Sequence, residues 1–362
     1  MIVCIMMYKS LCVFDVNFMT FVFIFKKLKS VNVHTVMQFI MGIKGLCTYF
    51  KTHASPRSIQ QVSLRDLEHK TIAIDASIYI YKFLEDGRLL ENMYTFVTQL
   101  LDAGVTPLFV FDGKPGEEKK DICMARYHRK VQACEKFNEL QTSFQAQCDS
   151  MTEEERDTWT AKMNRCKKRG MRIKTRHLEQ LKELVEGMGV YHCEAPSEAD
   201  VVCAYFVQKN IAYACASDDM DLFAYGCPRV LREWNGRKLS WSLYDCERLL
   251  QQDIGVAPTH CRDVLVLAGN DYTKKDHTNV ETVIEWYRNY VASETDQMLY
   301  DWLHHQHILT SEKRTDLERI SSLYDVPDHM VLHRPYQKHR DNVMNKSALE
   351  RLLSVYGYIF IR

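Results

Sequence analysis

Seven carboxylates stand where strands end or helices begin, and acidic side chains in such positions can bind divalent cations. Asp219 and Asp221 follow the apolar run at residues 211–217, which predicts a buried strand of a parallel sheet. Asp75 and Asp112 follow similar apolar runs. Open parallel sheets keep their sites at the carboxyl ends of the strands, so we expect these acids to converge. The full set is Asp75, Asp112, Glu198, Asp200, Asp219, Asp221 and Asp271.

These carboxylates cannot share a small space as bare anions, and the ions that would neutralise them define the chemistry. Two unit charges about 4 Å apart repel by about 4 kcal/mol at an effective dielectric constant of about 20. All-oxygen ligands select hard ions, so Mg²⁺ fits and Mn²⁺ can substitute, whereas Ca²⁺ would bind without supporting the same geometry. Two such ions about 4 Å apart clamp a phosphodiester and generate hydroxide from bound water. The predicted reaction is phosphodiester hydrolysis, and the alternative is that each acid merely caps a helix after a strand.

The elements that must position these acids form an α/β core. We expect a parallel sheet with helices on both faces, because apolar runs alternate with amphipathic stretches and right-handed crossovers are the default. Ser197 is the expected N-cap of one helix, with Asp200 in the reciprocal capping position. Another helix over residues 259–272 would place Asp271 at its junction with a loop.

Residues 114–176 differ from the core because they carry few apolar side chains and many basic ones. Residues 162–176 contain no acid at all. The segment has too few apolar residues for a core of its own, so we expect solvated helices. One interpretation is a plain surface helix pair, and the other is an arm that contacts nucleic-acid phosphates. The basic residues expected at DNA here are Lys114, Lys119, Arg126, Lys167, Lys168 and Arg169.

The composition of the whole chain bears on its binding partners and on its cellular compartment. Lys+Arg and Asp+Glu both number 47 among 362 residues, so no overall basic field identifies a nucleic-acid partner. The 13 cysteines form no CxxC pair and no Cys/His ligand spacing, which favours a reducing compartment. Residues 1–40 are expected to be a non-native or disordered extension, with translation starting at Met41. A signal peptide and a membrane-lying segment are the alternatives, since the apolar run at residues 18–25 is too short to span a bilayer.

Six blocks between Met41 and Tyr272 carry a more specific signal: MGIKGL, IAIDASIYIYKFL, LFVFDGKPG, APSEADVVCAY, ASDDMDLFAYG and VLAGNDY. In this order they resemble the structure-specific 5′ nucleases of the flap endonuclease family, within the XPG superfamily. The resemblance implies a PIN-like nuclease core with a helical arch, acting on branched DNA with a single-stranded 5′ flap. It implies a core formed by residues 41–112 and 177–272, an arch at 113–176, and a helical C-terminal DNA-binding region at 273–362.

The same resemblance implies roles for individual residues. All seven carboxylates fall on the family's metal-ligand positions, with Asp200 where flap endonucleases usually carry Glu. Lys119 and Arg126 match arch residues that approach the scissile phosphate, and with Asp219 they are the expected catalytic residues. Tyr81 matches the aromatic side chain that stacks on the base beside the cut.

The family's amino terminus begins at the position of Gly42. In the family this residue lies close to the active site, so Gly42 is expected to contact DNA.

Two departures from the family pattern limit what the resemblance implies. After Asp271 the family has a Gly-x-Gly element that grips duplex phosphates with a potassium ion, whereas residues 273–287 contain no glycine. Lys274 and Lys275 are expected to bind DNA by charge instead. The C-terminus lacks the sliding-clamp-binding peptide, so no clamp partner is expected, and these departures favour a viral member of the family.

The sequence therefore predicts a monomeric, structure-specific 5′ flap endonuclease that cuts near DNA junctions with two Mg²⁺ ions, in DNA replication, repair or recombination. We expect no membrane partner, and a location in the nucleus or another intracellular site of DNA replication. Within the superfamily, the alternatives are a 5′ exonuclease or a junction resolvase. From a different class, the alternative is a non-catalytic protein that binds DNA junctions.

Overall fold

A seven-stranded sheet forms the centre of the structure, a computed structural model that describes residues 43, 45–270, 272, 278–330, 332 and 344–355. The strand order is β1 (Ile59–Ser63), β7 (Ser240–Asp245), β6 (Arg229–Asn235), β5 (Ala214–Ala216), β2 (Thr71–Asp75), β3 (Thr106–Phe111) and β4 (Tyr191–Glu194). The strands from β6 to β4 in this order run parallel, and β7 and β1 extend the β6 edge in antiparallel fashion. This mostly parallel sheet confirms the predicted fold class.

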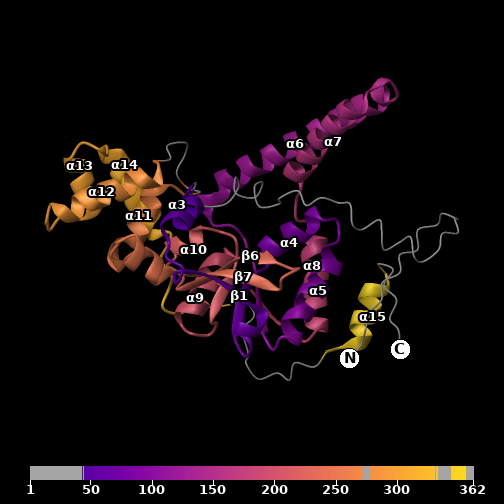
Figure 1. The fold of residues 1–362 in the computed structure, drawn as a ribbon, viewed down its shortest axis with the longest axis horizontal. Helices are drawn as coiled ribbons and strands as arrows, with labels where there is room; N and C mark the ends of the chain where they lie inside the picture. The colour runs from indigo at the N-terminus through magenta and orange to yellow at the C-terminus, as the bar shows by residue number, and fades with distance from the viewer. Residues whose placement is uncertain are drawn as a thin grey trace.

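Helices cover both faces of the sheet (Figure 1), because alternate residues of each strand point to opposite faces. In β2, Ile72 and Ile74 belong to the apolar core on one face, whereas Ala73 belongs to the core on the other. The first core is covered by α4 (Ala76–Glu85), α5 (Leu89–Asp102), α8 (Thr175–Gly187) and α15 (Lys346–Ser354). The second is covered by α3 (Leu46–His53), α9 (Ala199–Gln208), α10 (Asp221–Ala224) and α11 (Cys261–Ala268).

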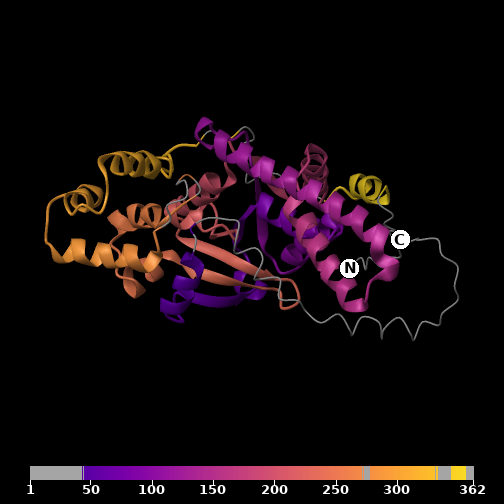
Figure 2. The same ribbon diagram turned by 90° about the horizontal axis from the view of Figure 1, so that it is seen from above.

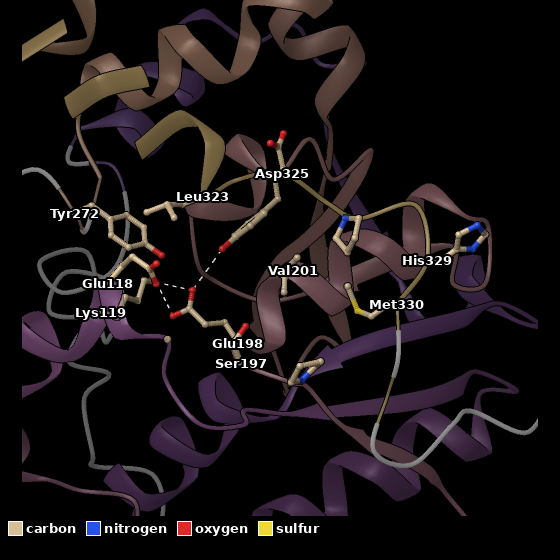
Figure 3. Close-up of a pocket in the computed structure, with 14 residues that line it drawn as sticks. Glu118, Lys119, Ser197, Glu198, Val201, Tyr272, Leu323, Asp325, His329 and Met330 are labelled. Atoms are coloured by element: carbon tan, nitrogen blue, oxygen red, sulfur yellow. Dashed lines mark hydrogen bonds and ion pairs between the residues drawn. The ribbon is translucent and has the colours of Figure 1, made fainter. Parts of the chain in front are cut away.

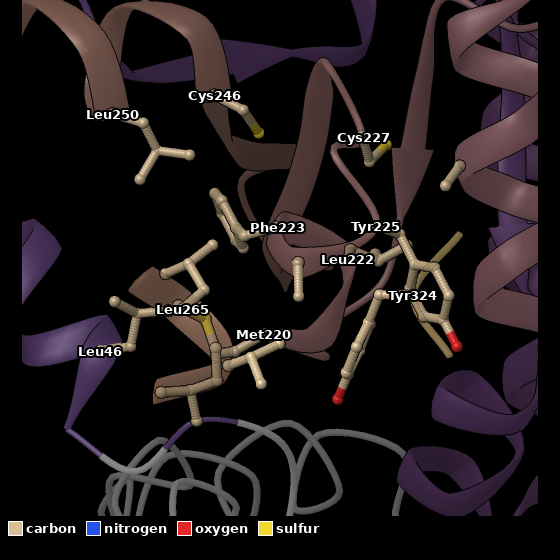
Figure 4. Close-up of a cluster of buried hydrophobic side chains, with 14 of the residues drawn as sticks. Leu46, Met220, Leu222, Phe223, Tyr225, Cys227, Cys246, Leu250, Leu265 and Tyr324 are labelled. Atoms are coloured by element: carbon tan, nitrogen blue, oxygen red, sulfur yellow. The ribbon is translucent and has the colours of Figure 1, made fainter. Parts of the chain in front are cut away.

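The second core continues into a helical C-terminal region. Helices α12 (Val280–Ala292), α13 (Leu299–His305) and α14 (Ser311–Ser322) contribute buried side chains to it. They lie at one end of the molecule and α15 lies at the other, in both views of the ribbon (Figures 1 and 2). Figure 4 shows Tyr324, which follows α14, among buried side chains of α10 and α11. The C-terminal region is therefore packed directly against the helix that begins at Asp221.

Two long helices, α6 (Lys120–Gln147) and α7 (Glu153–Gly170), form an antiparallel pair that projects from the core (Figure 1). They lie within the basic segment expected to be the arch. No residue of α6 is buried, and Gly170 is the only buried residue of α7. A side chain at Gly170 would meet the Cys134 Sγ atom at 2.6 Å, so the glycine allows the end of α7 to approach the middle of α6 closely. The pair is otherwise solvated, as the sequence predicts for a segment with few apolar residues.

Two predicted elements are shorter in the structure. The strand predicted over residues 211–217 is reduced to β5, because the backbone amides of Ile211 and Ala212 donate to the Phe206 carbonyl and close the end of α9. The helix predicted over residues 259–272 spans only α11, since Gly269 has φ +119° and leaves the helical conformation. Short 3-10 helices are η1 (Leu64–Leu67), η2 (Glu117–Lys119), η3 (Cys148–Ser150) and η5 (Pro258–His260), and η4 (Arg248–Asp253) is a π-helix. Within the described residues, no helix has the length and apolar character needed to cross a membrane.

Candidate active site

The parallel arrangement of β3, β2 and β5 brings several acids to one edge of the sheet. Asp75 is the last residue of β2, Asp112 directly follows β3, and Asp219 lies three residues beyond β5. Asp221 begins α10 and is 3% exposed, while Asp75 is 4% exposed. Buried carboxylates at the carboxyl ends of parallel strands are typical of a functional site in an open α/β sheet.

Asp75 is held by hydrogen bonds to both of its carboxylate oxygens. Ser217 Oγ donates to Asp75 Oδ2 at 2.9 Å, and the Ser77 backbone amide donates to Oδ1 at 3.0 Å. Because Ser217 follows β5 and Ser77 lies in α4, these bonds tie two neighbouring elements to one carboxylate. Asp75 therefore has a fixed orientation within the acid cluster.

Asp112 links β3 to the beginning of α9. Its Oδ2 accepts a hydrogen bond from Ser77 Oγ, and its Oδ1 accepts one from the Ala199 backbone amide at 2.8 Å. The predicted N-cap at Ser197 is wrong: the N-cap is Glu198, which makes no side-chain cap, and Asp112 satisfies an amide of the first turn instead. The Ser197 carbonyl accepts from the Gly113 amide at 2.7 Å, which holds this segment against the end of β3.

The acids lie close enough to raise one another's pKa values. Burial and then the Asp112 and Asp219 carboxylates raise the pKa of Asp75 well above its ordinary value. Burial and then the Asp219, Asp75 and Glu198 carboxylates do the same to the pKa of Asp200. Without a neutralising cation, part of this cluster is therefore protonated at pH values where an exposed carboxyl group is charged.

The donor set fits a divalent cation that keeps part of its water shell. Asp200 Oδ1 is buried and has no hydrogen-bond partner among the described residues, which leaves an oxygen available to a cation. Among the described residues, no group of three or more His, Cys, Asp and Glu side chains is placed to hold a metal ion by itself. Mg²⁺ does not require three protein ligands, because it usually binds through one or two carboxylates, several waters and substrate phosphates.

Lys119 pairs with Glu198 at the edge of the cluster (Figure 3). The Lys119 ammonium lies 2.6 Å from Glu198 Oε2 and 4.8 Å from the centre of the Tyr272 ring, and the residue is 9% exposed. Burial acts to lower the pKa of Lys119, but the Glu198 carboxylate, Tyr272 and Asp221 together outweigh burial and raise this pKa. A cavity of about 460 Å³ adjoins the pair, and its lining includes residues from 116–119, 196–201 and 323–330. A positive charge is thus held beside the acids at the foot of the α6–α7 pair.

The remaining predicted residues are distributed along the arch and core. Tyr81 in α4 accepts a hydrogen bond from Lys130 Nζ at 2.7 Å, and this ammonium lies over the Tyr81 ring. Arg126 is partly buried on α6. Exposed basic residues are Lys114 after β3 and Lys167, Lys168 and Arg169 at the end of α7, where Lys168 pairs with Glu85. The other predicted site residues, Gly42, Asp271, Lys274 and Lys275, lie outside the described residues.

Sequence reasoning missed several hydroxyl groups that contact the acids. Ser77 and Ser217 bind Asp75 or Asp112, and their positions next to the acids could have suggested it. Tyr225 OH lies 3.4 Å from Glu198 Oε2, and Tyr324 OH donates to Asp221 Oδ2 at 2.9 Å. Tyr324 is far along the sequence from every acid of the cluster, so only the folded chain reveals this contact.

Two family models match the parts of the chain that carry this site. The XPG N-terminal domain matches residues 41–133, and the XPG I-region matches residues 189–271. The first range contains Asp75, Asp112, Lys119 and Arg126, and the second contains the other five predicted metal ligands. The resemblance noted in the sequence is therefore confirmed over both halves of the core.

Curated relatives and solved structures give the same assignment. The chain is 30% identical over 277 residues to flap endonuclease 1 of Danio rerio and 28% identical over 278 residues to flap endonuclease 1-A of Oryza sativa subsp. japonica. Each alignment covers 68% of this chain and 69% of the relative. The catalytic core of Rad2 in complex with a DNA substrate has the same fold, with a TM-score of 0.58 at 19% identity, covering 87% of this chain and 94% of that one. This chain belongs to the flap endonuclease family.

Proposed function

We propose that the chain is a structure-specific 5′ flap endonuclease that cuts phosphodiester bonds near DNA junctions with two divalent metal ions. Mg²⁺ is the proposed metal, and Mn²⁺ can replace it. The observation that carries this proposal is the cluster of mutually repelling carboxylates around Asp200, which has a buried oxygen without a hydrogen-bond partner among the described residues. Oxygen donors that repel one another in this way match the needs of hard divalent cations.

The chain's own residues have distinct proposed tasks. The carboxylates of Asp75, Asp112, Asp200, Asp219 and Asp221 would hold the ions, together with Glu198 and Asp271. When bound, the ions supply an activated water and stabilise the charge that develops on the phosphate. Asp75 is already oriented by two hydrogen bonds, so little ordering is needed there.

Cationic side chains at the foot of the arch are proposed to act on the scissile phosphate. Lys119 is charged and stands beside the acids, where its ammonium can move from Glu198 to a phosphate oxygen. Arg126 lies seven residues further on, two helical turns along the same face. Preorganised positive charge in a partly buried site stabilises a developing anion more strongly than it would in water.

The proposed substrate is branched DNA with a single-stranded 5′ flap, bound by a monomer. Exposed cations at the end of α7 can contact flap phosphates, and Tyr81 can stack on a base beside the cut. The relatives from Danio rerio and Oryza sativa are named flap endonucleases, which favours a flap over other substrates. We place this activity in DNA replication, repair or recombination, in the nucleus or another intracellular site of DNA replication.

Cleavage of four end-labelled DNAs of matched sequence tests the substrate: a 5′ flap, a nicked duplex, a blunt duplex and a four-way junction, with the full chain and Mg²⁺. We expect selective cutting of the flap near its junction. Equal cutting of the four-way junction would support a junction resolvase instead, and stepwise shortening of the blunt duplex would support a 5′ exonuclease. Binding without cutting of any DNA would identify a non-catalytic junction-binding protein.

A further inference from the structure

A buried tyrosine from the C-terminal region contacts the acid cluster. Tyr324 lies two residues after the end of α14 and is 0% exposed. Its hydroxyl donates a hydrogen bond to Asp221 Oδ2 at 2.9 Å. The residue lies outside both ranges matched by the family models. A contact between residues 103 positions apart thus connects the C-terminal region to a proposed metal ligand.

Neighbouring rings hold the Tyr324 side chain in place. The Tyr225 and Tyr324 ring centres are 4.9 Å apart, and Figure 4 shows the two side chains next to each other. Tyr272 contacts Tyr324 edge-on, with ring centres 5.9 Å apart. Because the ring is fully buried and packed on two sides, it cannot turn without disturbing this cluster. The direction of its hydroxyl is therefore fixed.

The backbone around Tyr324 is anchored on α11. Ser321 Oγ donates to Asp263 Oδ1 at 2.6 Å, and Asp325 pairs with Arg262. The Tyr324 amide donates to the Ser321 carbonyl at 3.1 Å. These contacts fix the chain on both sides of Tyr324, so the position of its hydroxyl is set by α11 and α14 rather than by Asp221 itself.

We propose that Tyr324 is a positioning residue of the metal site, whose hydroxyl orients the Asp221 carboxylate for a divalent cation and couples the C-terminal region to the nuclease core. This inference rests on the proposed metal-dependent function. A hydrogen bond to one carboxylate oxygen limits rotation of the carboxylate. The orientation of its oxygens is therefore set before a cation binds. Such outer contacts to ligating side chains typically change metal affinity by about 10- to 100-fold when they are removed.

Mn²⁺ binding to the full chain, measured by electron paramagnetic resonance without DNA, tests the inference. Tyr324→Phe removes the hydroxyl and keeps the packed ring. The matched control is Tyr300→Phe, because Tyr300 is also buried in the C-terminal region but donates to the Asp263 backbone carbonyl at 2.9 Å. We expect Tyr324→Phe to weaken Mn²⁺ binding by at least about 10-fold. Tyr300→Phe should bind Mn²⁺ as the unsubstituted chain does.

A Mg²⁺ titration of flap cleavage provides a second readout. A positioning defect in the metal site should be rescued by higher Mg²⁺, so the rate with Tyr324→Phe should approach that of the unsubstituted chain at saturation. Equal Mn²⁺ affinity in Tyr324→Phe and the unsubstituted chain would overturn the inference. Equal weakening by both variants would also overturn it, because it would indicate a general packing effect. If the unsubstituted chain binds no Mn²⁺, the proposed function and the inference both fail. If the unsubstituted chain binds Mn²⁺ and Tyr324→Phe binds it equally well, only the inference fails.

Discussion

At the scale of single residues, the buried carboxyl groups of Asp75 and Asp200 link charge to stability. Burial and neighbouring carboxylates raise the pKa values of both above the ordinary value of 3.8. A carboxyl group with a raised pKa in the folded state binds more protons when folded. Its contribution to stability is therefore fully present below pH 3.8 and is lost as the pH rises through the folded-state pKa. The metal-free protein consequently loses this contribution at the pH values where the acids ionise.

Asp200→Asn should make the melting temperature of the metal-free protein less sensitive to pH. The substitution removes one of the repelling charges, so we expect a smaller decrease in melting temperature as the pH rises above 3.8 than in the unsubstituted chain. Each 1 kcal/mol of relieved repulsion shifts the melting temperature by about 2–4 °C in a domain of about 150–250 residues, and by less in a chain of 362 residues. Thermal unfolding in EDTA measures the effect, with the exposed Asp316→Asn on α14 as control. An Asp200→Asn pH profile parallel to that of the unsubstituted chain would contradict the electrostatic account.

Lys119 and its neighbour Lys120 offer a matched test of the proposed phosphate contact. Lys119 is buried beside Glu198, whereas the exposed Lys120 ammonium pairs with Glu117 at 2.6 Å. We expect Lys119→Met to lower kcat on a 5′ flap by about 100- to 1000-fold, the usual cost of losing one preorganised donor. Lys120→Met should leave kcat almost unchanged. Similar kcat values for the two variants, measured in the steady state with saturating flap DNA, would argue against a catalytic role for Lys119.

At the scale of elements, the loop after β3 joins the two halves of the core. The Gly113 amide binds the Ser197 carbonyl, and a Cβ atom at Gly113 would stand 2.1 Å from the Ala195 carbonyl oxygen. Only a residue without a side chain permits this approach, which places Asp112 beside the start of α9. The geometry of the acid cluster therefore depends on a backbone contact as well as on the acids themselves.

Gly113→Ala should destabilise the protein and displace the acids. Overpacking typically costs about 1–3 kcal/mol, so we expect a lower urea midpoint together with slower flap cleavage. Gly116→Ala is the control, since its added Cβ would meet only the flexible Glu118 carboxylate at 3.1 Å. An unchanged urea midpoint for Gly113→Ala would show that the loop can move without cost.

The elements that sequence could predict are those set by local patterns. Apolar runs ending at Asp75 and Asp112 predicted β2 and β3, because a buried parallel strand is a continuous apolar segment. The pairing of β1 with β7 joins residues more than 175 positions apart, and no local pattern specifies it. The cap predicted at Ser197 was wrong because a distant carboxylate, Asp112, supplies the hydrogen bond. The Tyr324 contact was missed for the same reason, since it depends on how α14 packs against α11.

At the scale of the whole molecule, charge is separated although the net charge is zero. Acids gather at the sheet edge, and exposed cations lie at the end of α7. A protein with this distribution can bind DNA through one surface without a general attraction to polyanions. The strength of binding should therefore depend on a few cations rather than on overall charge.

Lys167→Gln should reduce both the affinity for flap DNA and its salt dependence. Loss of one phosphate contact lowers the slope of log K against log salt by about 0.7 to 0.9. Lys168→Gln is the matched control, because the Lys168 ammonium already pairs with Glu85 and should contribute less. Fluorescence anisotropy at several salt concentrations measures both slopes. Equal slopes for the unsubstituted chain and Lys167→Gln would exclude a phosphate contact at Lys167.

Two adjacent carboxylates allow a direct test of the proposed role of the acid cluster in metal-dependent cleavage. Asp219 belongs to the cluster, whereas Asp218 Oδ1 accepts a hydrogen bond from the Glu233 amide at 2.8 Å. The measurement is Mg²⁺-dependent cleavage of a 5′-flap DNA by the full chain, Asp219→Asn and Asp218→Asn. We predict that Asp219→Asn lowers the rate by about 1000-fold or more, since several kcal/mol of stabilisation are lost. Asp218→Asn, which keeps the accepting oxygen, should still cut. Cleavage by Asp219→Asn at the unsubstituted rate, or no Mg²⁺-dependent cleavage by the unsubstituted chain, would contradict the account.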